Sequence, residues 1–563
     1  MIKENFIQLF ANSFKQNWDY PAHTNYGEDE TLNFSHVAEK VARLHILFEQ
    51  CGIKEDDKIA LLGRNSSNWA ISYIAAVTYG AVIVPILHDF NPKDIVQIIN
   101  HSESKLLIVE PSSWEKLDIS QLDELHVAFS LATFDCIKIL KQSDSEFFDE
   151  EKISPKTISA LFEKKYPKGF SKDDIKYAER DNKQLASINY TSGTTGFSKG
   201  VMCSGNALAG NITFGFRTEL LKQGYRVVAF LPFAHAYGCA FDFLTATCAG
   251  SHIYFITKTP VPKLLLSAFA EVKPSVIFTV PVIIEKIYRK QIQPTLSNPF
   301  IKVIMKIPGL NSLILSKIKN KIVTAFGGHF SQIIIGGAAL NPEVEAFFRK
   351  IKFPFTIGYG MTECAPLISY SHYSEFVSTS AGKTLDIMEA KVVDINPETG
   401  DGEICVRGEN LMDGYYKNPE ATKETIDESG WLHTGDLGTV DKDGNIYLRG
   451  RNKTMILGSS GQNIYPEEIE AKLNNMPYVQ ECLIVEKDAR IVALVYPDYE
   501  AQKEQEISDD ELLAQMENNR KQLNSLLASY EAVFKIVIRE EEFEKTPKKS
   551  IKRFMYQQNF LAK

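Results

Sequence analysis

The chain has 563 residues, of which 44% are hydrophobic and 24% are charged. These proportions are ordinary for globular protein and argue against long disordered tracts, and the length predicts more than one domain. The net charge of -9 disfavours a nucleic-acid partner, because phosphate backbones attract basic surfaces. The eight cysteines form no CxxC pair, which predicts buried, reduced thiols in a cytoplasmic protein.

The N-terminal region contains one stretch that needs care. The opening MIKENFIQLFANSF predicts an amphipathic helix rather than a secretory signal. Residues 69–88 carry no Asp, Glu, Lys or Arg and are long enough to cross a bilayer, but Gly80 and Pro85 divide them. We therefore expect a helix with an Asn or Ser cap that closes at Gly80, followed by a buried strand at 81–86.

Apolar runs at 57–63, 81–86 and 105–110, with helical patterns between them, predict a parallel sheet covered by helices. Further short strands are expected within 186–190, 226–233, 252–257, 275–281 and 332–337. The charged segment at about 164–183 is interpreted as a solvated surface connection.

After about residue 380 the pattern changes to short strands separated by turn residues, which predicts a small antiparallel β subdomain at about 380–450. Past Arg451 we expect a helix, two strands and a long polar helix near 509–530. The predicted class is therefore α/β: a large N-terminal domain of helix-covered sheets, residues 1–450, followed by a small mobile α+β domain, residues 451–563.

The segment YTSGTTGFSKG, residues 190–200, contains three glycines, three threonines, two serines and one lysine. Apolar segments on both sides predict a strand–loop–strand arrangement. It is not a Walker-type P-loop, because Gly200 follows Lys199 where Ser or Thr and a helix would be required. Glycines let successive N–H groups converge on one anion. The loop therefore predicts a polyphosphate site, with a surface hairpin as the alternative.

This loop resembles the phosphate-binding loop of the adenylate-forming superfamily, which includes acyl- and aryl-CoA ligases, luciferases and the adenylation domains of peptide synthetases. Five further segments resemble family motifs in the same order: LPFAHAYG (231–238), GGAAL (336–340), GYGMTE (358–363), GWLHTGD (430–436) and GRNKTMILGSSGQNIYPEEIE (450–470). Each alone would pass as a turn, a hairpin or a core histidine. The resemblance rests on their order along most of the chain.

The resemblance implies a role for each matching residue. Nucleotide and coenzyme binding would fall to Thr191, Ser192, Gly193, Thr194, Thr195 and Gly196 at the phosphates, Gly337, Ala338, Tyr359 and Gly360 at adenine and the acyl group, Asp436 and Arg451 at the ribose, and Gly461 at the thiol tunnel. The chemistry would fall to Lys199, His235, Thr362 and Glu363, with Glu363 holding Mg²⁺. Lys453 occupies the place of the hinge.

The resemblance also implies two half-reactions. A carboxylate first attacks the α-phosphate of ATP and gives an acyl-adenylate and pyrophosphate. The C-terminal domain then rotates about Lys453 and brings the thiol of coenzyme A to the adenylate. Two alternatives keep the fold but change the outcome: transfer to an acyl carrier protein, or release of the adenylate.

Residues 284–332 form a long, apolar and basic insertion that resembles the one in long-chain fatty acyl-CoA ligases. A long-chain fatty acid is therefore the expected substrate. Its lysine-rich, amphipathic character also suits peripheral contact with the inner face of a membrane. The alternative is a solvated helical insertion without a role in substrate choice.

The C-terminal tail departs from the family. Members usually end in T-x-x-G-K-I-x-R, whose lysine reaches the carboxylate and the α-phosphate. Here the tail reads TPKKSIKR, residues 546–553, and Ser550 stands in the lysine's place. We expect Lys549 to substitute through a one-residue shift. The alternatives are Lys552, or a degenerate nucleotide- or acyl-binding protein with weak adenylation.

Overall fold

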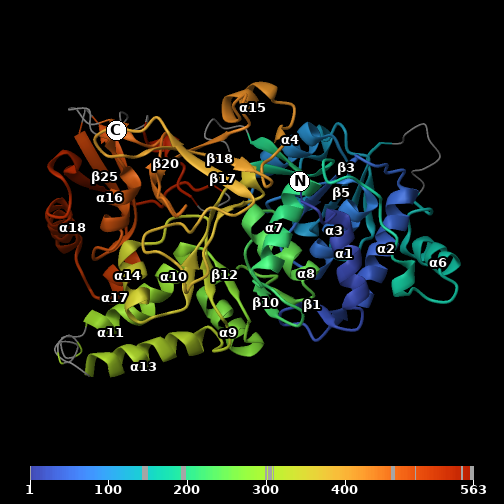
Figure 1. Ribbon diagram of the computed structural model, residues 1–563, viewed down its shortest axis with the longest axis horizontal. Coiled ribbons are helices and arrows are strands. Elements are labelled where there is room, and N and C mark those ends of the chain that lie inside the picture. The colour runs from blue at the N-terminus through green and yellow to red at the C-terminus, as the bar shows by residue number, and fades with distance from the viewer. Residues whose placement is uncertain are drawn as a thin grey trace. The chain divides into compact units, whose positions relative to one another are not determined.

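The computed structural model describes residues 2–141, 150–191, 198–297, 301, 307, 310–457, 463–487, 490–546 and 550–557. Figure 1 shows the helices and strands of the chain. They divide into two compact units, and each unit has its own apolar core. Unit 1 comprises Met1–Thr191, Ser198–Glu389 and Arg407–Gly430. The described part of unit 2 falls within Ala390–Val406 and Trp431–Lys563.

An eight-stranded sheet forms the centre of unit 1. Its order is β19 (Gly414–Tyr415), β9 (Lys199–Ser204), β8 (Leu185–Thr191), β4 (Val82–Ile86), β3 (Lys58–Leu62), β5 (Ser104–Val109), β6 (Val127–Ser130) and β7 (Cys136–Ile139). The five strands from β8 to β6 run parallel, whereas β9, β19 and β7 pair antiparallel with their neighbours. The predicted parallel sheet is thus the middle of a mixed sheet.

Helices cover both faces of this sheet. The helices before and after its strands are α1 (Phe6–Gln16), α2 (Phe34–Gln50), α3 (Ser67–Tyr79), α4 (Pro92–Ser102), α5 (Pro111–Trp114), α6 (Pro155–Lys165) and α7 (Gly205–Arg217). The apolar side of α4 packs on the sheet face that carries Ala60 and Val84. Figure 1 shows α4 and α3 on opposite sides of β3 and β5.

The stretch at 69–88 has the predicted helix and strand. The Ser66 hydroxyl accepts the N–H of Trp69 at the start of α3, and Gly80 ends the helix in the left-handed region. β4 follows and is fully buried. Within the part of the chain that the structure describes, no helix is long and apolar enough to cross a membrane.

Unit 1 also contains three smaller sheets. They are β10 (Arg226–Ala229), β11 (His252–Phe255), β1 (Pro21–Asn25) and β2 (Thr31–Asn33); the parallel β12 (Ile277–Thr279), β13 (Ile333–Ile335) and β14 (Phe355–Ile357); and β15 (Tyr359–Gly360) with β16 (Leu367–Ser369). The strands expected within 226–233, 252–257, 275–281 and 332–337 are present as β10, β11, β12 and β13. Each is shorter than expected, and they belong to two different sheets. The sequence did not predict β1, because His23, Thr24 and Asn25 are polar. These three residues form a strand by pairing in parallel with β11.

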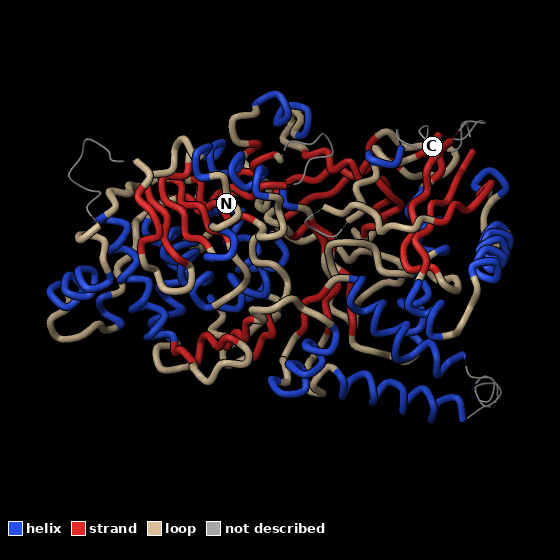
Figure 2. The backbone as a smooth tube through the Cα atoms, turned by 180° about the vertical axis from the view of Figure 1, so that it is seen from behind, coloured by secondary structure: helices blue, strands red, loops and turns tan. Residues whose placement is uncertain are grey.

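The insertion at 284–332 is mostly helical where it is described. The helices between β10 and β14, some of which belong to the insertion, are α8 (Ala246–Cys248), α9 (Pro262–Val272), α10 (Pro281–Ile287), α11 (Gln293–Ser297), α13 (Leu310–Ala325) and α14 (Pro342–Lys350). α13 is a single straight helix (Figure 2). Ile322 near its end is buried, and Phe326 packs on Phe269 of α9 with ring centroids 5.5 Å apart. Leu313 at the other end is 60% exposed.

Unit 2 holds the second group of sheets. They are β17 (Met388–Val393), β18 (Gly402–Gly408), β20 (Leu432–Val440) and β21 (Ile446–Arg451); β22 (Ile456–Leu457) with β23 (Asn463–Ile464); and β24 (Val479–Lys487), β25 (Arg490–Pro497) and β26 (Val533–Ile538). The division between the units falls within β17 and β18. The remaining helices are α15 (Pro419–Thr425), which belongs to unit 1, and α16 (Pro466–Leu473), α17 (Tyr499–Glu504), α18 (Asp509–Asn524) and α19 (Phe554–Gln557).

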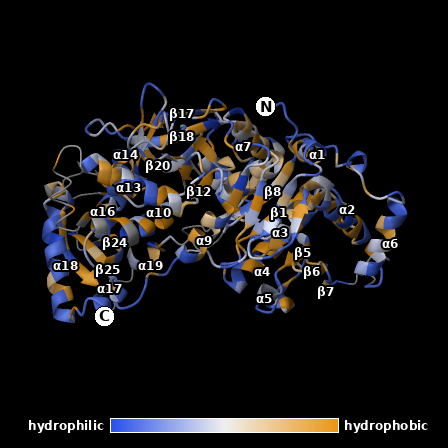
Figure 3. Ribbon diagram, turned by 90° about the horizontal axis from the view of Figure 1, so that it is seen from below, coloured by the Kyte–Doolittle hydropathy of each residue, from blue (hydrophilic) through white to orange (hydrophobic). Residues whose placement is uncertain are grey.

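The core of unit 2 lies between its three-stranded sheet and two helices. Ile469 and Leu473 of α16 and Leu512 and Met516 of α18 pack with the sheet residue Val495. The rest of α18 is mostly hydrophilic (Figure 3). The helix, strands and long polar helix expected past Arg451 are therefore present.

Two smaller expectations have different outcomes. All eight cysteines are free, and only Cys136 is not fully buried, so the prediction of reduced thiols is confirmed. The solvated connection at 164–183 is wrong in part, because Ile175 is buried and the Tyr177 ring packs against Phe14 and His45. Two inward-facing side chains in a mostly charged segment are too few to give a periodic pattern that the sequence would reveal.

Candidate active site

The glycine-rich segment joins two strands of the central sheet. β8 and β9 pair antiparallel, with Tyr190 opposite Gly200 and Thr191 opposite Lys199, which confirms the strand–loop–strand interpretation. The Tyr190 hydroxyl lies 2.7 Å from Nδ1 of His101 in α4, and burial raises the pKa of Tyr190. The loop residues Ser192, Gly193, Thr194, Thr195 and Gly196 lie outside the described residues.

Tyr415 of β19 connects two residues that the sequence placed in one reaction. Its hydroxyl donates to Oε1 of Glu363 at 2.9 Å. The Nζ of Lys199 lies over the same ring, 4.6 Å from its centroid. β19 reaches this place by pairing with β9, where Tyr415 stands opposite Val201. The structure therefore brings Lys199 and Glu363 to one aromatic side chain.

The charges in this cluster are open to a ligand. Burial and, after it, the charge of Glu363 raise the pKa of Tyr415, so its hydroxyl stays protonated and donates. Among the described residues, Oε2 of Glu363 receives no hydrogen bond and Lys199 forms no ion pair. A half-buried carboxylate oxygen is a ligand that Mg²⁺ takes, and a lysine that forms no ion pair with a described acidic residue suits a phosphate. The residues present therefore fit a magnesium–phosphate group.

The GYGMTE segment is held by short strands and a tight turn. Tyr359 and Gly360 form β15, where Tyr359 pairs with Ser369. A side chain at Gly360 would collide with the backbone carbonyl of Pro366, so only glycine fits. Thr362 is buried in the 3₁₀ turn that follows, next to the half-buried Glu363. The strand and the turn thus fix the main-chain position from which the Glu363 side chain extends.

Asn65, which lies beyond the end of β3, shapes the LPFAHAYG segment. Its side-chain amide donates to the carbonyl of Leu231 at 2.7 Å and accepts the N–H of Phe233 at 2.9 Å. This bracing holds the turn that carries His235. Nδ1 of His235 accepts the backbone N–H of Tyr237 at 3.3 Å, which sets the orientation of the imidazole ring.

The GGAAL segment contacts the same turn. The Tyr237 hydroxyl donates to the carbonyl of Ile334 in β13 at 2.9 Å. A Cβ at Gly336 would lie 3.2 Å from the Tyr237 ring. The next residue, Gly337, has φ +85° and is exposed together with Ala338. The two motifs, predicted separately, therefore meet at the end of β13.

In unit 2 the two residues predicted to bind the ribose lie next to each other. Asp436 in β20 stands opposite Arg451 in β21, and Oδ1 of Asp436 lies 2.9 Å from Nε of Arg451. The Asp436 side chain is 9% exposed and that of Arg451 is 62% exposed. Lys453 follows in an exposed turn. The two charges are thus already paired with each other.

The C-terminal tail forms a small hairpin in unit 2. Lys545 pairs with Ile551, and the N–H of Thr546 donates to the carbonyl of Ser550 at 2.7 Å. Ser550 therefore lies at the base of this hairpin. Lys549, like Gly461, lies outside the described residues.

The basic residues around this hairpin have acidic partners. Lys545 pairs with Glu481 at 2.7 Å and Lys552 with Glu544 at 3.4 Å. Arg553 pairs with Glu470 of α16, whose second oxygen accepts the backbone N–H of Ile484. These contacts tie the tail to the core of unit 2.

Burial sets the titration of the Glu470–Arg553 pair. It raises the pKa of Glu470 to about 7, although the charge of Arg553 works against it. Burial also acts to lower the pKa of Arg553, but the attraction of Glu470 and Glu467 outweighs it and raises that pKa. The arginine is therefore charged at neutral pH while Glu470 titrates there.

Sequence reasoning missed Tyr415. It lies in GYYKNPE, where two tyrosines follow a glycine in an otherwise polar turn. That aromatic pair was the available signal. Its significance depends on the pairing of β19 with β9, which joins segments far apart in the chain and cannot be inferred from local pattern.

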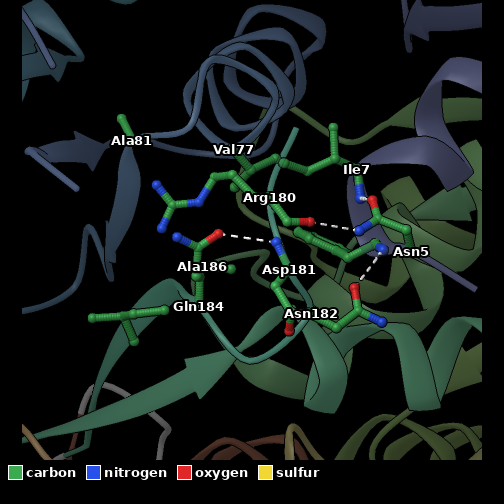
Figure 4. A pocket seen from close by; sticks show the side chains of 12 residues that line it. Asn5, Ile7, Val77, Ala81, Arg180, Asp181, Asn182, Gln184 and Ala186 are labelled. Carbon is green, nitrogen blue, oxygen red and sulfur yellow. Dashed lines mark hydrogen bonds between the residues drawn. The ribbon is translucent and has the colours of Figure 1, made fainter. Parts of the chain in front are cut away.

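A small cavity elsewhere in unit 1 does not belong to this site. It lies where α1 meets the start of β8 (Figure 4). Its polar groups bond to one another: the Asn5 side chain donates to the carbonyl of Arg180, and the Phe6 N–H donates to Asn182. The cavity therefore lies at the contact between the start of α1 and residues 180–182, and hydrogen bonds hold the helix there.

Comparison with known proteins agrees with the fold and the motifs. The AMP-binding enzyme family matches residues 10–416, and the AMP-binding enzyme C-terminal domain matches residues 453–563. A long-chain-fatty-acid–CoA ligase of Mycobacterium bovis is 26% identical over 91% of this chain and 88% of the relative. A chloroplastic long-chain-fatty-acid–[acyl-carrier-protein] ligase of Arabidopsis thaliana is 28% identical over 80% of this chain and 70% of the relative.

Solved structures share the fold. The anthranilate CoA ligase AuaEII in complex with anthranoyl-AMP has a TM-score of 0.76 and 19% identity, over 98% of this chain and 96% of that chain. ATP-bound MatB from Rhodopseudomonas palustris has a TM-score of 0.73 and 22% identity, over 99% of both chains. The predicted fold class and the resemblance are confirmed. With its large domain and its C-terminal domain both matched, the chain belongs to the AMP-binding enzyme family.

Proposed function

We propose that this protein activates a long-chain fatty acid with ATP, forming acyl-AMP and pyrophosphate, and then transfers the acyl group to coenzyme A. The observation that carries the proposal is the Lys199–Tyr415–Glu363 cluster, whose Lys199 begins β9. A pure nucleotide binder has no need of an acid placed for Mg²⁺ beside a lysine placed for phosphate. The family assignment supplies the rest, since adenylate-forming enzymes use ATP.

In the first half-reaction, a carboxylate oxygen of the acid bonds to the α-phosphorus and pyrophosphate leaves. Lys199 and the loop residues 191–196 hold the β- and γ-phosphates, and Thr362 donates to the α-phosphate. Mg²⁺ on Glu363 would neutralise charge that develops on the phosphoryl oxygens. His235 lies between the phosphates and the acid, and Gly337, Ala338, Tyr359 and Gly360 shape the adenine and acyl site. Positioning two anions in line accounts for much of the rate gain.

The ribose and the thiol depend on unit 2. Asp436 accepts from the ribose hydroxyls and Arg451 contacts the same sugar, which requires both to exchange their present pairing for the ligand. Rotation about Lys453 then exposes the adenylate to the thiol, along a tunnel that Gly461 lines. Lys549 provides the cation of the adenylation step. The partners of Lys545, Lys552 and Arg553 within unit 2 favour this assignment over Lys552.

The proposal of a long-chain acid rests on the insertion and on the relatives. In the chain, α10, α11 and α13 lie between β12 and β13, and β13 leads directly into the GGAAL segment that we assign to the acyl site. The two cited relatives, 28% and 26% identical to this chain, are both named for long-chain fatty acids. Peripheral membrane contact by α13 rests only on its lysines and on the exposed Leu313.

A second acceptor has one observation in its favour. The Arabidopsis relative is named for transfer to acyl carrier protein rather than to coenzyme A. The adenylation step is the same for both acceptors, so the residues of unit 1 do not separate them. Only the thiol that consumes the adenylate differs.

One experiment tests the whole proposal. The full chain is incubated with ATP, Mg²⁺, coenzyme A and an equimolar pool of acetate, octanoate, palmitate and benzoate, and products are identified by mass spectrometry. We expect palmitoyl-CoA and AMP to dominate. Dominance of acetyl- or benzoyl-CoA would reject the long-chain substrate. If acyl-AMP accumulates and is consumed only when acyl carrier protein is added, the acceptor is acyl carrier protein and not coenzyme A.

A further inference from the structure

Three side chains of unit 2 that the proposed reaction does not use converge on one point. Cys405 and Glu403 belong to β18, and His433 belongs to β20, where it stands directly opposite Cys405. The Cys405 Sγ lies 3.5 Å from Nδ1 of His433, and Oε2 of Glu403 lies 2.8 Å from the same nitrogen. The three donor atoms all lie within 4.8 Å of one another.

A local irregularity of the sheet produces this convergence. From Glu403 to Cys405 β18 advances two residues, while its partner positions in β20 run from Leu437 back to His433. The extra residues of β20 form a bulge in which Gly435 has φ +70° and donates its N–H to Oε1 of Glu403 at 2.9 Å. Bulges redirect side chains and are frequent next to functional sites.

The geometry argues against a nucleophilic relay. In a relay, the base uses one ring nitrogen for the nucleophile and the other for the orienting acid. Here Cys405 and Glu403 both face Nδ1 of His433. One ring nitrogen has a single in-plane direction for a proton or lone pair, so it cannot serve both. Three donor atoms facing a common centre are instead the arrangement of a metal site.

The donor set selects the class of ion. A thiolate, an imidazole and a carboxylate suit Zn²⁺, whereas Mg²⁺ and Ca²⁺ require oxygen ligands. Around a tetrahedral Zn²⁺ such donor atoms lie about 3.3 to 3.6 Å apart. The 3.5 Å between Cys405 and His433 already matches, and the Glu403 carboxylate needs to withdraw by about half an ångström.

We propose that Glu403, Cys405 and His433 form a binding site for Zn²⁺ or a similar thiophilic divalent cation, with a fourth position open to water. The ion enters past His433, whose side chain is 33% exposed, because Cys405 is fully buried. Coordination replaces the thiol proton of Cys405, which is released to solvent. The bound ion links β18 to β20 at the bulge that carries Asp436.

Cobalt provides a direct probe, since a thiolate bound to Co²⁺ gives a charge-transfer absorption in the near ultraviolet. The metal-free full chain is titrated with Co²⁺, then with Zn²⁺ as competitor and with Mg²⁺ as a control ion. We expect one equivalent of Co²⁺ to produce the absorption, Zn²⁺ to abolish it and Mg²⁺ to leave it unchanged. Absence of the absorption in the wild-type chain would overturn the proposal.

Variants identify the ligands. Cys405→Ser should lose the absorption, while Cys136→Ser should keep it, because Cys136 is the most accessible thiol but belongs to no cluster of metal-ligating side chains in the described part of the chain. His433→Gln changes a partly exposed side chain and should weaken Zn²⁺ binding about 100-fold, which keeps the test decisive if the buried Cys405 variant fails to fold. Unchanged affinity in His433→Gln, or loss in Cys136→Ser, would reject the site. These readouts do not depend on acyl-CoA synthesis.

Discussion

The phosphate side and the ribose side of the proposed site differ in how their charges are held. In unit 1, Lys199 and Glu363 contact the neutral hydroxyl and ring of Tyr415 and have no ion pair among the described residues. In unit 2, Asp436 is paired with Arg451 and Glu470 with Arg553. Unit 1 is thus arranged for an incoming anion and cation, whereas unit 2 must exchange existing partners.

The two arrangements predict different energetic consequences of ligand binding. A charge with no ion pair gains the whole interaction when the ligand arrives, so its loss should appear in the chemical step. A charge that already has an ion-pair partner gains only the difference in interaction free energy between the ligand and that partner. Substitutions in unit 1 should therefore be severe for adenylation, and those in unit 2 should alter stability or one half-reaction.

The largest effect is expected at Glu363. Glu363→Gln removes the proposed Mg²⁺ ligand while keeping its shape, and acid-dependent ATP–pyrophosphate exchange should fall about 100- to 1000-fold. The matched control is Glu389→Gln, an exposed acid paired with Arg407, which should leave exchange unchanged. If exchange in Glu363→Gln falls less than fivefold, Glu363 is not a Mg²⁺ ligand, and the two units differ less than we infer.

The next effect is on stability and concerns Glu470. Its folded pKa of about 7 exceeds the unfolded value near 4.5, so its contribution to stability is full below about pH 4.5 and is lost as pH rises through about 7. Relative to Glu470→Gln, the wild type should lose about 3 kcal/mol of unfolding free energy between those limits. Urea unfolding from pH 5 to 8 measures most of this change.

The control for Glu470 is Glu517→Gln. Glu517 also contacts an arginine of unit 2, Arg520, but the pair is on the surface. The unfolding free energy of Glu517→Gln should depend on pH between 5 and 8 in the same way as that of the wild type. A wild-type chain that unfolds in parallel with Glu470→Gln at every pH would show that burial does not govern this pair.

Lys549 separates the two half-reactions. Lys549→Ala should reduce adenylation about 100-fold, because it removes a cation from the transition state, while thioester formation from supplied acyl-adenylate is retained. Lys552→Ala is the control, since Lys552 pairs with Glu544. Equal and mild losses in both steps would reject Lys549 as the substitute for the lysine missing at Ser550.

The smallest effect distinguishes positioning from chemistry. Tyr415→Phe keeps the ring beside Lys199 but removes the hydrogen bond to Glu363, and kcat/KM for adenylation should fall about tenfold with a raised requirement for Mg²⁺. Tyr416→Phe is a matched control, because its hydroxyl donates to Glu103 on the surface. If both variants lose the same activity, the effect is structural and Tyr415 has no special role.

The sequence allowed much of the fold to be predicted, because strand–loop–strand and helix–strand patterns are local. It identified the motif residues by order and type. It could not assign short strands to sheets, since β10 and β12 have similar apolar patterns but different partners. Nor could it find Tyr415 or the Arg553–Glu470 pair, because both depend on contacts between distant segments.

The proposed reaction at the Lys199–Tyr415–Glu363 cluster is the adenylation of a fatty acid. The most direct measurement is ATP–pyrophosphate exchange with Mg²⁺ and palmitate in the absence of coenzyme A. We expect exchange that depends on the acid and is lost in Glu363→Gln. If a folded chain that binds ATP exchanges no faster with palmitate than without it, the protein does not adenylate this acid.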